Sequence, residues 1–128
     1  MALLREQADH FDHLVLADSP IVLQKQDDVV VLTDLRVDAV CAEQRAETER
    51  YETGTPEHSA SVARLVAAQR AIRNTPKGYW VASARPDAAF HALTGSVPAN
   101  EVRAAAALSD GTSRLVTEYQ VATWGGRL

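Results

Sequence analysis

The sequence predicts a mixed α/β fold of the α+β type, in which mainly antiparallel strands are flanked by helices. Two runs rich in β-branched residues, 21–23 and 29–33, are separated by a polar stretch of the length typical of a hairpin connection. From residue 56 to 73, apolar side chains recur at spacings of three and four, which is the period of a helix. Hydrophobic residues make up 46% of the chain and aromatic residues 5%, so the core is expected to consist of small side chains.

The first part of the chain is expected to begin with a helix and to continue with strands. Residues 3–11 can form a short helix or the end of one, whereas the apolar run 13–17 is too short for a helix and is interpreted as a strand. Together with the hairpin, that strand makes a three-strand meander. Residues 35–50 then have the pattern of an amphipathic helix. The Thr33–Asp34 pair is expected to cap its start, and the single cysteine, Cys41, to lie on its apolar side as a core residue.

The helix predicted at residues 56–73 has clear start and stop signals. Thr55 can accept a hydrogen bond from the unpaired amides of the first turn, and Pro56 suits the first helical position. The helix is expected to stop at residues 74–78, which contain a proline and a glycine. Three short elements are expected after it, namely a strand at 79–82, a helix of one or two turns at 86–92, and a strand at 96–98.

Composition narrows the class of protein. A chain of 128 residues supports one modest core, and residues 1–128 are therefore interpreted as a single domain. The net charge of −4 argues against a nucleic-acid partner, which would require a clustered basic surface. No run of about 18 apolar residues is present, and the first residues lack the apolar stretch of a signal peptide. We therefore expect a cytoplasmic protein without a membrane partner.

Three short motifs occur in a fixed order. Ala17-Asp18-Ser19-Pro20 ends an apolar strand, Leu32-Thr33-Asp34-Leu35 ends the hairpin, and Leu108-Ser109-Asp110-Gly111 follows a later apolar run. This order resembles the metal-dependent protein phosphatases of the protein phosphatase 2C family. In that family Gly-Asp-Ser-Arg opens a hairpin that closes on Leu-Thr-x-Asp-His, and Leu-x-Ser-Asp-Gly comes later. The resemblance is to divergent bacterial members and extends from about Phe11 to Val116.

The resemblance implies a partial two-sheet sandwich and a metal-dependent hydrolase. It implies that the alanine-rich run 102–108 is a strand, although its composition alone also allows a helix. The implied substrate is a phosphoserine or phosphothreonine of a phosphoprotein, and the implied cofactor is Mg²⁺ or Mn²⁺. Such ions prefer carboxylate ligands, and a pair of them both neutralises phosphate charge and acidifies the attacking water. Asp110 matches the family's metal-ligating aspartate, Asp18 matches an aspartate that in some members helps to hold an additional, weaker metal, and Gly111 and Ser19 lie beside them.

The chain also departs from the family's pattern. The family's site needs an N-terminal Asp-Gly-x-Gly-Gly strand end and a C-terminal Asp-Asn pair. No glycine precedes Asp18, and neither Asp nor Asn follows Asp110. We therefore expect the central and C-terminal part of a phosphatase domain, incomplete and inactive as a single copy.

Three interpretations stay open. The chain can be a phosphatase-like domain, a catalytically inactive pseudo-phosphatase that binds a partner, or a remnant without independent function. In the last case an exposed sheet edge would favour a homodimer. At residue level, Asp18 can also simply close a local turn, and Asp110 in Ser-Asp-Gly is equally typical of a turn between a strand and a helix.

Overall fold

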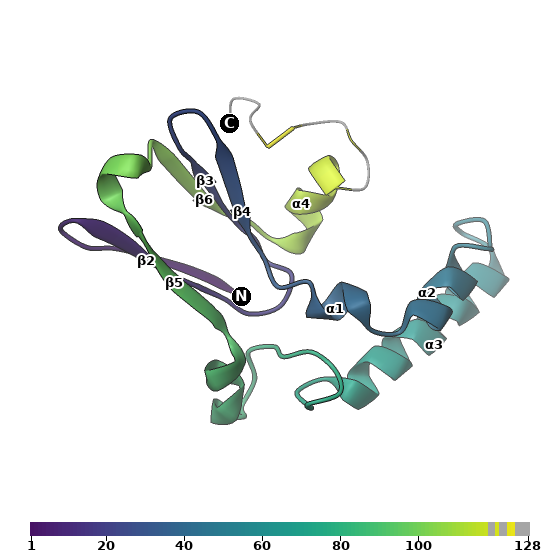
Figure 1. Ribbon diagram of the computed structural model, residues 1–128. Helices are drawn as coiled ribbons and strands as arrows, with labels where there is room; N and C mark the ends of the chain where they lie inside the picture. Colours follow the sequence, from purple (N-terminus) through teal and green to yellow (C-terminus); the bar gives the residue numbers. More distant parts are fainter. Residues whose placement is uncertain (118–119, 121–122, 125–128) are drawn as a thin grey trace. The chain divides into compact units, whose positions relative to one another are not determined.

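The computed structural model describes residues 1–117, 120 and 123–124, and it confirms a mixed fold of helices and antiparallel sheets (Figure 1). The chain divides into two compact units. The first consists of Met1–Asp34 together with Ala82–Leu128, and the second of Leu35–Val81. The strands of the described residues lie in the first unit, whereas the second is helical.

One sheet of the first unit has β2 (His10–Val15) at its centre, between β1 (Ala2–Glu6) and β5 (Leu93–Pro98). The helix expected at residues 3–11 is therefore wrong, because this segment is β1 and the turn into β2. The amide of Gln7 donates to the carbonyl of His10 at 2.8 Å and closes that turn. Pairing with β2 outweighs the helix propensity of the Leu-Leu-Arg-Glu run.

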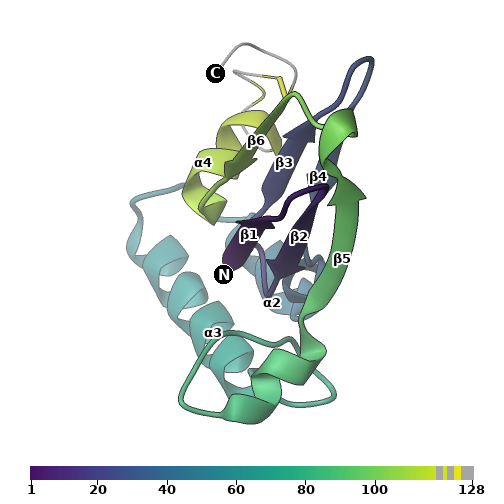
Figure 2. The ribbon, with the colours of Figure 1, turned by 90° about the vertical axis from the view of Figure 1, so that its left-hand side faces the viewer.

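The second sheet has β3 (Ile21–Gln24) at its centre, between β4 (Val29–Leu32) and β6 (Ala104–Ala107) (Figure 2). The β3–β4 hairpin and the alanine-rich strand are as predicted. The three-strand meander is wrong, since β2 and β3 belong to different sheets. The chain changes sheet at residues 17–20, where Ala17 has a left-handed backbone (φ 62°) that redirects it.

The core of the first unit lies between the two sheets. Val15, Ile21 and Leu23 are at most 1% exposed. Further apolar side chains from both sheets and the adjoining segment pack on these three: Ala2, Leu4, Val30, Leu32, Val97 and Val102. Because side chains alternate along a strand, the intervening residues of β1, β2 and β5 face away from the core.

The second unit contains α1 (Arg36–Ala39), α2 (Ala42–Thr48) and α3 (Pro56–Ile72). The prediction of one helix over residues 35–50 is wrong in its continuity, because Cys41 has φ 58° and separates α1 from α2. Cys41 is also only half-buried rather than a core residue. The prediction for α3 is confirmed, and the Thr55 hydroxyl accepts from the amide of His58 at 3.2 Å.

Asn74 organises the segment after α3. This residue is left-handed (φ 56°), its amide donates to the carbonyl of Tyr79 at 2.7 Å, and its side-chain oxygen accepts from the amide of Val81 at 2.8 Å. The strand expected at residues 79–82 is therefore wrong, since this segment pairs with Asn74 and not with a sheet. Tyr79 and Trp80 are nevertheless buried.

The remaining elements belong to the first unit. They are the 3-10 helices η1 (Pro86–His91) and η2 (Ala99–Glu101) and the helix α4 (Asp110–Thr117). The short helix expected at residues 86–92 is thus present as η1. Among the helices described, none combines the length and the apolar character needed to cross a membrane.

Candidate functional site

The sheet β4-β3-β6 brings the two predicted metal ligands, Asp18 and Asp110, to the same end. Because β3 is antiparallel to both neighbours, its start lies beside the ends of β4 and β6, and Ile21 pairs with both Leu32 and Ala107. The amide of Leu108 also donates to the carbonyl of Pro20 at 2.9 Å. Asp18 lies two residues before that bond and Asp110 two residues after it.

Asp110 is exposed and is the first residue of α4. Its charge is favourable there, since the N-terminus of a helix is the positive end of its dipole. The guanidinium of Arg114, one turn later, lies 4.0 Å from its carboxylate. Gly111 is also exposed, and a β-carbon there would meet only the Ser109 hydroxyl, at 4.0 Å. The carboxylate of Asp110 is therefore accessible to a cation, in competition with Arg114.

Asp18 and Ser19 are half-buried in the short segment that links the sheets. The amide of Ala17 donates to Oδ2 of Asp34 at 3.3 Å, and Asp34 is only 1% exposed. The expected cap on the following helix is therefore wrong: the residue at that position is Leu35, with no side-chain hydrogen bond. Asp34 instead turns back toward the segment before Asp18.

The donors at this end of the sheet suit a hard cation in type but not in number. Mg²⁺ and Mn²⁺ prefer oxygen ligands, and Asp18 and Asp110 supply carboxylates. Within the described part of the chain, no three His, Cys, Asp or Glu side chains are grouped so that they could hold a metal ion. Asp18 and Asp110 therefore do not make up a metal site by themselves among the described residues.

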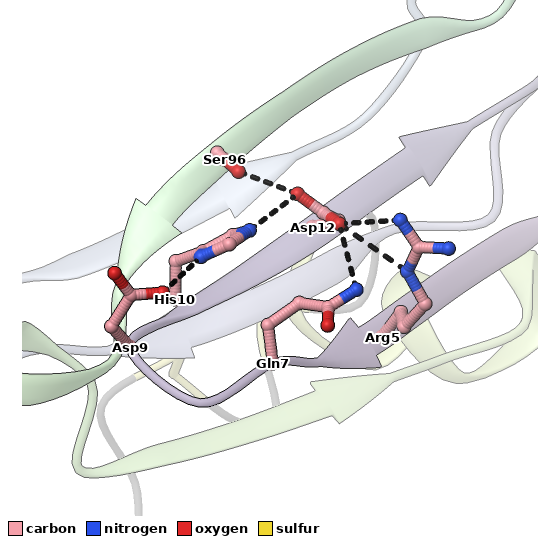
Figure 3. Close-up of polar contacts among 6 residues, drawn as sticks. All are labelled: Arg5, Gln7, Asp9, His10, Asp12 and Ser96. Atoms are coloured by element: carbon pink, nitrogen blue, oxygen red, sulfur yellow. Dashed lines mark hydrogen bonds and ion pairs between the residues drawn. The ribbon is translucent and has the colours of Figure 1, made fainter.

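A second polar cluster, which the sequence analysis missed, lies on the outer face of the sheet β1-β2-β5 (Figure 3). Its centre is Asp12 of β2, which accepts hydrogen bonds from the Ser96 hydroxyl of β5 at 2.6 Å and from Nη2 of Arg5 of β1 at 2.7 Å. The side-chain amide of Gln7 donates to Oδ2 of Asp12 at 3.4 Å, and Nε2 of His10 lies 3.3 Å from Oδ1 of Asp12. The pKa of Asp12 is held well below its usual range, first by the Ser96 hydroxyl and then by Arg5.

His10 connects the Asp12 cluster to a second carboxylate. Its Nδ1 lies 2.5 Å from Oδ1 of Asp9, also drawn in Figure 3. This hydrogen bond raises the pKa of His10 and lowers the pKa of Asp9. The imidazole therefore lies between Asp9 and Asp12, and its protonated form is favoured.

A groove of about 600 Å³ runs along this face of the sheet. It is lined by Leu3, Arg5, Asp12, His13, Leu14, Thr94, Gly95 and Ser96. The His13 ring lies against Gly95 on the opposite side of the sheet, which it shares with the core residue Val15, and its buried Nδ1 has no hydrogen-bond partner among the described residues. The lining of the groove combines charged side chains, such as Arg5 and Asp12, with apolar ones, such as Leu3 and Leu14. The sequence carries no clear local signal for this face, because Glu6, Asp9 and His13 interrupt any regular alternation of polar and apolar residues.

Comparison of the chain with family models, with curated proteins and with solved structures finds no match in any of the three. The function is therefore inferred from the motif order and from the geometry of the sheets.

Proposed function

We propose that this chain is part of a metal-dependent phosphatase-like domain that hydrolyses phosphoserine or phosphothreonine in proteins, with Mg²⁺ or Mn²⁺ as cofactor. One observation carries the proposal. The Asp-Ser motif and the Ser-Asp-Gly motif, far apart in the sequence, meet at one end of the sheet β4-β3-β6. The sandwich of two antiparallel sheets is also the architecture that the motif order implies.

The roles of the residues follow from their places. Asp110 is accessible at the start of α4, and Asp18 lies in a segment fixed at both ends, so each offers carboxylate oxygens to a cation. Bound divalent cations would neutralise the phosphate and acidify the attacking water. Since a single copy does not supply a full ligand set, we expect it to be inactive. The other ligands would come from a second copy or from another polypeptide segment.

Hydrolysis of p-nitrophenyl phosphate tests the proposal, measured over a range of chain concentrations with and without Mn²⁺. If a second copy completes the site, we expect turnover that needs Mn²⁺, rises more steeply than linearly with chain concentration, and is lost in Asp110→Asn. Asp27→Asn is the matched control, because Asp27 is an exposed aspartate in the β3–β4 turn at the other end of the sheet. A folded chain without turnover at any concentration would contradict catalysis by this chain.

The second candidate is a pseudo-phosphatase that binds a protein partner in the cytoplasm, without nucleic acid or membrane. Two observations favour it. The groove beside Asp12 is large enough for a small group, and β1, β5, β4 and β6 each pair on one side only among the described residues. Unpaired strand edges can accept a strand from another chain, including a second copy of this one. A stable homodimer without turnover, seen by sedimentation, would support this function over the enzyme.

A further inference from the structure

The turn that precedes Asp18 has an unfavourable backbone conformation. Ala17 has φ 62°, in the left-handed region. A β-carbon makes this region costly, and it is populated mainly by glycine and, less often, by Asn or Asp. Ala17 is also buried, at 6% exposure, so surrounding contacts must hold this conformation in place.

Asp34 supplies one such contact. Its Oδ2 accepts from the amide of Ala17 at 3.3 Å, and the side chain is 1% exposed. Asp34 follows the end of β4, which lies beside the start of β3, so the bond ties the turn to the neighbouring strand. A buried carboxylate is stable only when it is hydrogen-bonded, so the Ala17 amide is one of the groups that stabilise Asp34 in this position.

The linking segment is tied at its other end as well. The carbonyl of Pro20 accepts from the amide of Leu108, the residue directly after β6. Asp18 and Ser19 therefore lie between two fixed points, one tied to the end of β4 and the other to the end of β6. The direction in which Asp18 leaves the backbone depends on the conformation of the residue before it.

We propose that Asp34 is a positioning residue for Asp18. Its carboxylate holds Ala17 in the left-handed conformation and thereby directs Asp18 toward the end of the sheet where Asp110 lies. The use of Asp18 as a metal ligand rests on the proposed function, whereas the restraint on the turn does not. Asp34 itself is too deeply buried to reach a cation at the surface.

The test combines amide hydrogen exchange with Mn²⁺-induced broadening of amide NMR signals. In Asp34→Ala we expect the Ala17 amide to exchange at least ten times faster while the Leu23 amide in the core stays protected. Since the proposed cation is shared, we also expect broadening at Asp18 and at Asp110 to require more Mn²⁺ in this variant. Asp34→Asn retains an acceptor oxygen and should keep both properties. General destabilisation would instead also speed exchange of the Leu23 amide, which is fully buried in the core.

A glycine at position 17 provides the second variant. Because glycine adopts the left-handed conformation without strain, Ala17→Gly should restore Mn²⁺ broadening at Asp18 in the Asp34→Ala background. If Asp34→Ala alone does not fold, the double variant should fold. Thr55→Ala is the control for loss of a hydrogen bond far along the chain, since Thr55 caps α3, and it should leave the Ala17 amide unchanged.

Each outcome bears on one claim. Unchanged exchange of the Ala17 amide in Asp34→Ala overturns the positioning role, even if Mn²⁺ binds as the proposed function requires. A double variant that remains unfolded also overturns it. So does a double variant that does not regain broadening at Asp18, provided that the wild type shows this broadening. If Mn²⁺ broadens neither aspartate in the wild type, the proposed function fails, and faster exchange at Ala17 still supports the restraint by Asp34.

Discussion

The carboxylate of Asp12 ties three strands together, because it belongs to β2 and accepts hydrogen bonds from Arg5 of β1 and Ser96 of β5. These donors favour the ionised form, so the pKa of Asp12 is lower in the folded chain than in the unfolded chain. A lowered pKa means that Asp12 stabilises the fold at pH values above about 4, its unfolded pKa. This stabilisation is lost as the pH falls through the lower, folded pKa.

Replacement of this carboxylate should therefore change the pH profile of stability. We expect Asp12→Asn to lower the Tm between pH 5 and 7 and to make the acid limb of the profile shallower, because the variant loses the titrating group that the fold protects. Thermal unfolding followed by circular dichroism from pH 2 to 7 measures both effects. Asp27→Asn serves as the control. Parallel acid limbs for the wild type and Asp12→Asn would contradict the role of this cluster.

His10 provides a second test at the residue scale. Its pKa is raised, first through the hydrogen bond with Asp9, so protonated His10 stabilises the fold below its unfolded pKa of about 6.5. That contribution is lost as the pH rises through the folded pKa. Asp9→Asn should lower the pKa of His10, as measured by NMR titration of the imidazole. An unchanged pKa in this variant would show that Asp9 is not the main cause.

At the scale of single elements, local signals and long-range pairing had different predictive value. The β3–β4 hairpin and α3 were predicted because their signals lie within a few residues, such as the Thr55 cap and the polar turn. β1 was not, because its residues are good helix formers and become a strand only by pairing with β2. The break at Cys41 was missed for a related reason, since no glycine or proline marks it.

The segment after α3 gives a prediction at this scale. A β-carbon at Gly78 would collide with the backbone carbonyl of Ile72, which cannot move without disturbing the end of α3. Gly78→Ala should therefore lower the free energy of unfolding by about 1–3 kcal/mol, the range typical of overpacking. Urea denaturation measures this loss. Gly111→Ala is the matched control, because space is open around Gly111, and an equal effect in both variants would contradict the steric explanation.

At the scale of the whole molecule, the mixed fold class was predicted correctly, and the strand that the motif order implied within residues 102–108 is present as β6. The placement of Asp18 and Asp110 at the same end of the sheet depends on that strand, because the two motifs come together only when β6 pairs with β3. The Asp12 cluster could not be predicted, since it depends on the register of three strands, one of which was expected to be a helix. Long-range register was therefore the information that local patterns lacked.

The central claim is that Asp18 and Asp110 serve one cation, and a Mn²⁺ titration of the ¹⁵N-labelled chain tests it most directly. We expect the amide signals of Asp18 and Asp110 to broaden together at the same Mn²⁺ concentrations, and both effects to weaken in Asp110→Asn. Signals in the β3–β4 turn, around Asp27, should broaden less. Broadening at Asp18 that persists unchanged in Asp110→Asn, or none at either aspartate, would contradict a shared metal site.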